Sequence, residues 1–178
     1  GGVLTTNNDK LYNWLSKARN HGLKNRDECE FWSMNSRLDN LQAAILNVKL
    51  KYFEQWTEHR RKIAGIYYSR LKNLNMIVPH DKPKERAVYH TFIIQTKFRD
   101  ELKKFLSENG IDTKVHYPIP IHFQKAAKGL KYKKGSFHII EKQVKTILSL
   151  PIYPELVDKQ VDFVCDKILE FYSQKRNG

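Results

Sequence analysis

The chain has 178 residues, which is enough for one substantial hydrophobic core and a second, smaller packing unit. Its hydrophobic content of 40% and aromatic content of 12% are typical of folded proteins and exclude a chain that is disordered throughout. The 32 Lys and Arg residues outnumber the 19 Asp and Glu residues, so the net charge is +13, and a nucleic acid, an anionic membrane or a phosphorylated ligand has to be considered as a partner.

The distribution of lysines and cysteines narrows the class of protein. The lysines are spread between Lys10 and Lys175, mostly as single residues on predicted helices, which favours solvated faces over a nucleic-acid-binding surface. No apolar run approaches the roughly 18 residues of a membrane span. Cys29 and Cys165 are far apart and form no CxxC motif, which predicts two reduced thiols. We therefore expect a cytoplasmic protein without a nucleic-acid or membrane partner.

The first 34 residues predict a strand, a helix and a loop, in that order. Small and β-branched residues favour a short buried strand over residues 2–6. Apolar residues at helical spacing predict a helix over residues 9–19, which Gly22 ends as a glycine just past the C-terminus. Residues 23–34 show no period and are predicted to form the loop that leads to the next element.

A long amphipathic helix is predicted over residues 35–74, a stretch with no proline and a single glycine. Its apolar residues recur at three- and four-residue spacing, namely Leu38, Leu41, Ile45, Val48, Tyr52, Trp56, Ile63, Tyr67, Leu71 and Leu74. Ser36 and Asp39 are a candidate capping pair at its start. Because such a helix is longer than a small domain is wide, we expect it to bend or to cross between two domains. Asn35 and Arg37 are then placed at a helix N-terminus, which favours an anion.

The remaining residues predict an α+β domain. The patterns indicate strands over residues 75–79, 88–96 and 111–116, and helices over residues 99–109, 137–149 and 158–173. This order of strands and helices predicts a sheet with helices on one face.

A proline-rich segment follows the third of these strands. Pro118 and Pro120 predict a rigid, extended loop over residues 117–122, because each proline removes a backbone donor and biases the preceding residue. His116, Tyr117 and His122 lie on this loop or next to it, and rigid loops on a scaffold suit ligand contacts. The lysine-rich residues 125–136 are predicted to form a further loop.

Most familiar catalytic motifs are missing from the sequence. It contains no G-x-S-x-G nucleophile elbow, no GxGxxG and no P-loop. His116, His122 and His138 match no known spacing of metal ligands, so we expect no metal site. Spacing alone indicates an α/β protein that binds a phosphorylated ligand.

Four blocks of sequence carry a more specific signal. They are RNHG at residues 19–22, NSRLDNLQAAIL at residues 35–46, HYPIPIHFQ at residues 116–124 and LSLPIYPEL at residues 148–156. In these blocks, their order and their spacing, the chain resembles the DegT/StrS family of pyridoxal-phosphate-dependent sugar aminotransferases. The resemblance extends over essentially the whole chain.

The resemblance implies a type I aminotransferase fold, in which a large domain holds pyridoxal 5'-phosphate and a smaller C-terminal domain closes over it. The active site of such enzymes lies at a homodimer interface. Residues 1–34 are then the tail of the large cofactor-binding domain. Residues 35–178 are the long connecting helix and the small C-terminal α+β domain. The expected fold is therefore the C-terminal part of this α/β architecture.

The same resemblance predicts which parts of the enzyme lie outside this sequence. In the family, the lysine that forms the Schiff base lies a few residues before the position of Gly1, and the aspartate that faces the pyridine nitrogen lies further upstream. The chain is therefore expected to contain no catalytic residue and to be inactive alone. The complete enzyme is expected to transfer an amino group from an amino acid, such as glutamate, to a nucleotide-linked keto-sugar. Within this class of acceptors, a 3-keto-6-deoxyhexose is the more specific expectation. Some members of the family carry histidine in place of the lysine and dehydrate instead.

Five residues are candidates for the site through this resemblance. Asn35 matches the asparagine that reaches the cofactor phosphate of the neighbouring subunit, although a role in helix capping is the alternative. Arg37 is placed to neutralise phosphate or substrate, or to form an ion pair within the dimer. His116, Tyr117 and His122 match the loop near the sugar nucleotide, and simple packing is the alternative for each. Two other functions stay open, a non-catalytic sugar-nucleotide-binding, dimerisation or regulatory fragment of the family and a basic nucleic-acid binder.

Overall fold

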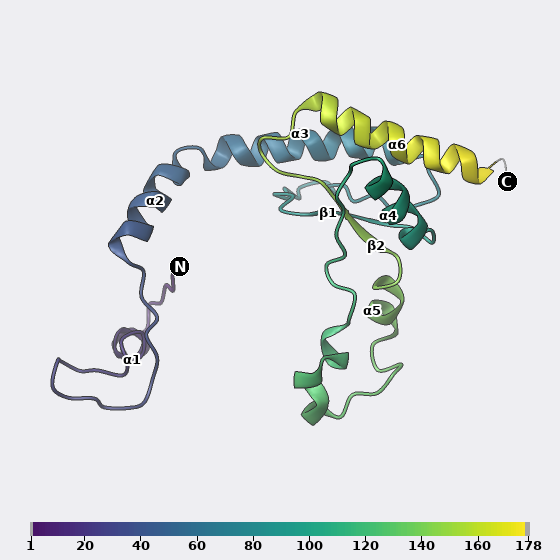
Figure 1. Cartoon of the computed structure of the whole chain (residues 1–178). Coiled ribbons are helices and arrows are strands. Elements are labelled where there is room, and N and C mark those ends of the chain that lie inside the picture. Colours follow the sequence, from purple (N-terminus) through teal and green to yellow (C-terminus); the bar gives the residue numbers. More distant parts are fainter. Residues whose placement is uncertain (1, 177–178) are drawn as a thin grey trace. The chain divides into compact units, whose positions relative to one another are not determined.

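The computed structural model describes residues 2–176, with the side chain of Arg176 left out of the description. Its contacts divide the chain into two compact units, Gly1–Phe53 and Glu54–Gly178 (Figure 1). The boundary between these units falls near the start of the helix α3, Phe53–Leu71. The predicted division at residues 34 and 35 concerns the domains of a complete enzyme and stays a prediction.

The first unit contains the helices α1, Asp9–Ala18, and α2, Asn40–Leu50. The prediction of α1 is confirmed, and the helix is capped by Asn8, whose Oδ1 accepts a hydrogen bond from the N–H of Leu11 at 3.1 Å. The predicted strand over residues 2–6 is wrong. A strand needs a neighbour for its backbone groups, and the described residues of this unit place none beside it.

The predicted long helix is two helices, α2 and α3, the latter spanning Phe53–Leu71 with a turn between them. The predicted start at residue 35 is also wrong, because α2 begins at Asn40. Asp39 and Gln42 form a capping box there, in which the N–H of Asp39 donates to Oε1 of Gln42 at 3.3 Å. The proposed capping pair of Ser36 with Asp39 does not form, since the residues before Asp39 are extended rather than helical.

In the second unit, α3 lies beside the C-terminal helix α6, Asp158–Arg176 (Figure 1). Near the start of α6, Lys62 of α3 forms an ion pair with Asp158 at 2.6 Å. Further along both helices, Arg70 of α3 forms ion pairs with Asp162 at 2.8 Å and with Asp166 at 2.6 Å. Because the partners ascend together in both helices, α3 and α6 run in the same direction. These ion pairs are largely exposed, so the apolar contacts beneath them contribute most of the stability.

The helices of the second unit pack on an antiparallel sheet of two strands, β1, Phe92–Gln95, and β2, Ile147–Leu150. The register pairs Phe92 with Leu150 and Gln95 with Ile147. Two of the predicted strands are reduced to single bridges, between Ile77 and Gln95 and between Lys114 and Ser149. The buried cluster around the sheet includes Ile63, Tyr67, Leu71, Phe92, Ile94, Leu102, Leu106, Leu148, Val161, Cys165 and Ile168.

The helix predicted over residues 137–149 is wrong in its second half. The helix α5 covers only His138–Gln143, and the chain then enters β2. Every residue of β2 is buried, and its sequence ILSL is too short and too rich in apolar residues for periodicity to separate it from a buried helix. The helices predicted around α4, Arg99–Glu108, and α6 are confirmed, as is the mixed α/β class.

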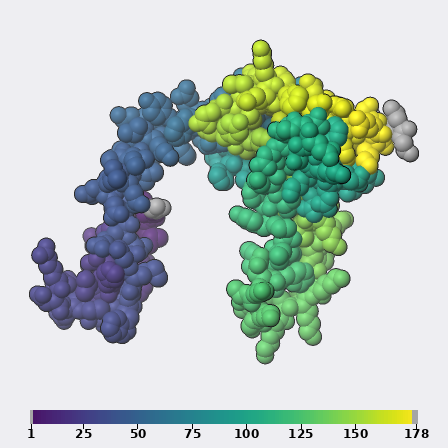
Figure 2. All heavy atoms as spheres, viewed as in Figure 1, coloured from purple at the N-terminus to yellow at the C-terminus, as the bar shows by residue number. Residues whose placement is uncertain are grey.

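An arm, defined as residues 117–143, projects from the rest of the second unit (Figure 2). It contains the two 3-10 helices η1, Ile121–Phe123, and η2, Lys125–Leu130, followed by α5. The predicted proline-rich loop therefore ends in a short helical turn, and part of the predicted lysine-rich loop is helical. Among the described residues, no helix is both long and apolar enough to cross a membrane.

The two thiols lie in different surroundings, which predicts different reactivity. Cys165 is completely buried, and burial raises the pKa of its thiol to about 12. Cys29 is exposed. Because the thiolate is the reactive form, iodoacetamide at pH 8 is expected to modify Cys29 alone in the folded chain, and Cys165 only after denaturation. Mass spectrometry of the intact chain counts the adducts. With Cys29→Ser no adduct is expected, and a rapid native adduct in that variant contradicts the prediction.

Candidate functional site

The RNHG block forms the turn after α1. His21 and Gly22 are both left-handed, with φ of 60° and 74°, and the N–H of Gly22 donates to the carbonyl of Lys17 at 2.9 Å. A Cβ atom on Gly22 would lie 1.7 Å from the carbonyl oxygen of Phe31. Only glycine therefore fits this position, because the chain returns against it.

This turn holds the segment that contains Asn35. The N–H of His21 donates to the carbonyl of Met34 at 3.1 Å, and the N–H of Ser36 donates to the carbonyl of Arg19 at 2.8 Å. Asn35 thus stands in an antiparallel bridge opposite Asn20. The expectation that Asn35 and Arg37 occupy a helix N-terminus is wrong, since paired backbone, and not the end of α2, sets their position.

Asn35 and Arg37 are in direct contact. Nε of Arg37 donates to Oδ1 of Asn35 at 2.7 Å, which orients the amide so that its NH₂ group faces away from the guanidinium. Both side chains are exposed, and no carboxylate in the described part of the chain pairs with Arg37. An amide donor and an unpaired guanidinium side by side are a donor set that fits a phosphate group.

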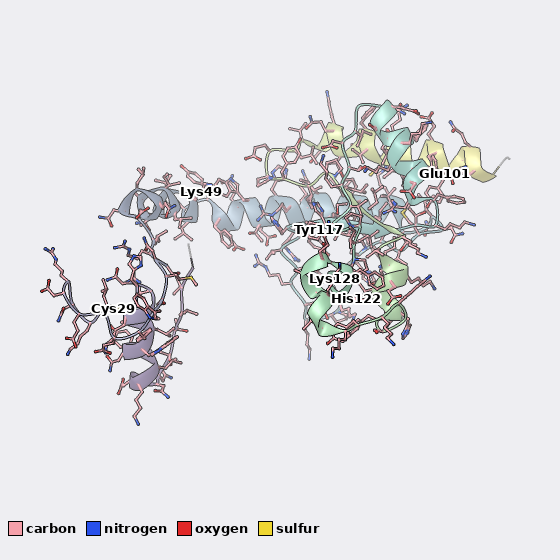
Figure 3. The ribbon with its side chains drawn as sticks, turned by 60° about the horizontal axis from the view of Figure 1, so that its bottom comes forward. Cys29, Lys49, Glu101, Tyr117, His122 and Lys128 are labelled. Carbon is pink, nitrogen blue, oxygen red and sulfur yellow. The ribbon has the colours of Figure 1, made fainter. Side chains whose placement is uncertain are left out.

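His116 and Tyr117 lie where the arm begins. Figure 3 labels Tyr117 there and His122 further along the arm. Nδ1 of His116 is 2.9 Å from Oγ of Ser149, a buried residue of β2, and the His116 and Tyr117 rings are 5.3 Å apart edge to face. The side chain of Tyr117 is free to meet a ligand, because the residue is 71% exposed.

A cavity of about 650 Å³ adjoins His116 and Ser149. Its wall continues along the segment after β2 and the first turns of α6, and it includes the basic side chains of Lys114 and Lys159. The volume suits a ligand of nucleotide size. Lys159 supplies positive charge to its rim, whereas Lys114 pairs at 2.9 Å with Asp112, which lines the same cavity.

His122 is turned inward. Its side chain is 6% exposed, and its Nε2 lies 3.1 Å from Oε1 of Glu141, whose side chain is 15% exposed. The N–H groups of Gly135 and Phe137 also donate to Glu141, and these bonds, with His122, lower the pKa of its carboxyl group. The contribution of Gly135 is the largest. Direct contact between His122 and a substrate stays a prediction.

The candidate residues therefore form separate groups. Asn35 contacts Arg37 in the first unit, and His116 contacts Tyr117 in the second, while His122 faces the interior of the arm. Within residues 2–176, no group of three His, Cys, Asp or Glu side chains is placed to hold a metal ion.

The sequence interpretation missed Glu141 and Ser149, which bind His122 and His116. Ser149 gives no local signal, because it lies in an apolar run whose partner is distant in the chain. Glu141 gives a weak signal as the only carboxylate between Asp112 and Glu155.

Residues 1–169 match the DegT/DnrJ/EryC1/StrS aminotransferase family. The chain belongs to this family. It is 41% identical, over 97% of its length, to a "Pleiotropic regulatory protein" of Geobacillus stearothermophilus, of which it covers 47%. It is 38% identical, over 94% of its length, to the dTDP-3-amino-3,6-dideoxy-alpha-D-galactopyranose transaminase of Aneurinibacillus thermoaerophilus, of which it covers 46%.

The fold of the chain matches the crystal structure of a DegT DnrJ EryC1 StrS aminotransferase from Brucella abortus, with a TM-score of 0.85 and 32% identity over 94% of this chain and 45% of that protein. The crystal structure of S. venezuelae DesV has a TM-score of 0.88 and 36% identity, over 94% of this chain and 45% of that protein. The expectation of an α/β part of the aminotransferase fold is confirmed. The chain spans a little under half the length of these relatives.

The four sequence blocks that resemble the DegT/DnrJ/EryC1/StrS family are joined in pairs by the fold. RNHG binds the segment that opens with Asn35 through two backbone hydrogen bonds. The block that begins at His116 is joined to β2, part of the fourth block, through Ser149. In each pair, one block holds the backbone or a side chain of the other in place: RNHG holds the segment of Asn35, and β2 holds His116.

Replacing Gly22 tests whether the turn holds Asn35 in place. Gly22→Ala is expected to break the two backbone bonds, because the new Cβ atom cannot share space with the carbonyl of Phe31. The amides of His21 and Ser36 then lose their protection from hydrogen exchange, measured by NMR. Gly110→Ala is the matched control, since Gly110 has the same φ of 74° but open space around it. Gly110→Ala is expected to lower the free energy of unfolding only by the strain of the left-handed backbone, about 1–2 kcal/mol. Unchanged protection in Gly22→Ala contradicts the assignment.

Proposed function

We propose that this chain is the C-terminal part of a pyridoxal-phosphate-dependent aminotransferase that acts on a nucleotide-linked keto-sugar. The amino group comes from an amino acid, with glutamate as the donor, and the acceptor is a 3-keto-6-deoxyhexose. The observation that carries the proposal is the exposed pair of Asn35 and Arg37, held on paired backbone in a member of an aminotransferase family. The names of the relatives support the choice of substrate class.

In this proposal Asn35 donates its amide NH₂ to the phosphate of the cofactor in the partner subunit of a homodimer. Arg37 keeps that amide oriented and adds positive charge beside the phosphate. When bound, pyridoxal 5'-phosphate supplies the carbonyl chemistry that carries the amino group from donor to acceptor. The lysine that holds this cofactor is expected upstream of Gly1, so the chain alone is inactive.

The second unit provides the sugar side of the site. Tyr117 presents its exposed hydroxyl group, and His116 is oriented by its bond to Ser149. Lys159 brings positive charge to the neighbouring cavity, as a nucleoside diphosphate requires, while Lys114 is held there by its ion pair with Asp112. The prolines at positions 118 and 120 limit the backbone freedom of this segment.

A second candidate is a non-catalytic fragment that regulates or binds without cofactor, and the name of the Geobacillus relative favours it. The coding sequence before Gly1 separates the two. An in-frame lysine shortly upstream supports the aminotransferase, a start codon there supports the fragment, and a histidine in place of the lysine supports the dehydrating branch of the family.

The complete protein tests the proposed reaction directly. With dTDP-3-amino-3,6-dideoxy-α-D-galactopyranose and 2-oxoglutarate, it is expected to release glutamate, which is transamination measured in reverse. The 178-residue chain is the matched control and is expected to release none. A complete protein that carries the upstream lysine but transfers no amino group contradicts the proposal.

Removing the Asn35 amide is expected to weaken retention of the cofactor. Asn35→Ala in the complete protein loses one hydrogen bond to a charged group, about 1.5–3 kcal/mol, or roughly 10–100-fold in the dissociation constant. Loss of the absorption of bound pyridoxal 5'-phosphate on dialysis measures the change. Asn13→Ala, an exposed residue of α1 in the same unit, is the control and is expected to change nothing.

Mixed dimers test whether Asn35 acts across the subunit interface. Subunits with Asn35→Ala, mixed with subunits that lack the upstream lysine, are expected to regain activity. One of the two sites in such a dimer combines the intact lysine of one subunit with the intact Asn35 of the other. No recovery over the separate variants indicates that Asn35 acts within its own subunit.

A further inference from the structure

Glu141 lies in a lysine-rich stretch of sequence but forms no ion pair with a lysine in the described part of the chain. It is the only carboxylate between Asp112 and Glu155, a stretch that carries eight lysines. Within the described part of the chain, however, none of these lysines pairs with it, and the side chain that it contacts is His122. The Glu141 carboxylate therefore makes its contacts inside the arm, although the stretch of sequence around it is rich in lysine.

The carboxylate of Glu141 ties three segments of the arm together. The N–H of Gly135 donates to both of its oxygens at 2.9 Å, and the N–H of Phe137 donates to Oε1 at 3.3 Å. The third donor is His122, on η1, at 3.1 Å. A carboxylate only accepts hydrogen bonds, so Nε2 of His122 carries the hydrogen. The His122 ring also packs on Phe123, with centroids 4.1 Å apart, and on Phe137 at 4.9 Å.

The His122 contact anchors one end of the segment that carries Tyr117. The other end is anchored by the bond between His116 and Ser149 of β2. Between these anchors, Pro118 and Pro120 have fixed φ angles, so a displacement at His122 is passed along the segment instead of being absorbed by it. The exposed side chain of Tyr117 therefore depends on both anchors for its position.

We propose that Glu141 is a positioning residue of the sugar site. By holding His122, it fixes residues 116–123 so that Tyr117 meets the nucleotide-linked sugar in a single orientation. In this proposal His122 affects the substrate by fixing the backbone of this segment, and its side chain does not contact the substrate. This inference rests on the function proposed above.

The first experiment tests the contact itself in the complete protein. Glu141→Ala is expected to speed hydrogen exchange of the Gly135 and Phe137 amides by about tenfold or more, since both lose their acceptor. Glu108→Ala is the matched control, because Glu108 is an exposed acid of the same unit whose contact with Lys104 is 3.8 Å long. Unchanged exchange in Glu141→Ala overturns the proposal.

The second experiment tests the consequence for the sugar. With dTDP-3-amino-3,6-dideoxy-α-D-galactopyranose as probe, Glu141→Ala is expected to raise KM by about tenfold, the loss of one well-placed hydrogen bond, with a smaller change in kcat. Glu141→Gln keeps an acceptor for Gly135 and is expected to restore most of the affinity. In that variant the amide oxygen is expected to take the place of Oε1, which accepts from Gly135, Phe137 and His122. Nε2 of His122 then keeps its hydrogen, and ¹⁵N NMR of the imidazole is expected to show an unchanged tautomer.

The outcomes separate the two proposals. Faster amide exchange in Glu141→Ala with an unchanged KM overturns the positioning role and leaves the proposed function standing. If kcat falls only in proportion to the fraction of protein that is folded and active, and KM does not change, Glu141 has a structural role alone. This outcome also overturns the positioning role. No amino transfer by the unaltered complete protein overturns the proposed function, and the positioning role fails with it.

Discussion

The antiparallel pairing of β1 with β2 is the constraint on which the second unit depends. β2 is buried along its whole length, so its backbone groups require β1 on one side and the bridge from Lys114 on the other. The helices α3, α4 and α6 contribute the apolar side chains that cover this small sheet. The same strand supplies Ser149, which holds His116. The core and the candidate sugar site therefore share one element.

Paired backbone also sets the position of the candidate cofactor contact. Asn35 stands opposite Asn20, and Gly22 permits the close return of the chain at Phe31. A side chain at a helix terminus is subject to fraying, whereas one in a bridge moves only if two backbone hydrogen bonds open. Both polar segments of the proposed site thus rest on short pieces of paired chain.

Elements with a strong helical period could be predicted from the sequence. The helices α1, α4 and α6 each keep one apolar face, and the four blocks identified the family. β2 could not be predicted as a strand, because all four of its residues are buried and so short a run can equally belong to a buried helix. The start of α2 was missed because Ser36 bonds Arg19, a contact set by the turn at Gly22. Glu141 and Ser149 were missed as site residues for the same reason, since their partners are brought to them only by the fold.

The prolines at positions 118 and 120 have a thermodynamic consequence. Their rings restrict the backbone in the unfolded chain as well, so ordering this segment costs less conformational entropy than ordering a flexible loop of equal length. A ligand that meets Tyr117 does not then have to immobilise the loop itself. More of the contact free energy remains as affinity, so a ligand that few side chains of this segment contact can still be bound tightly.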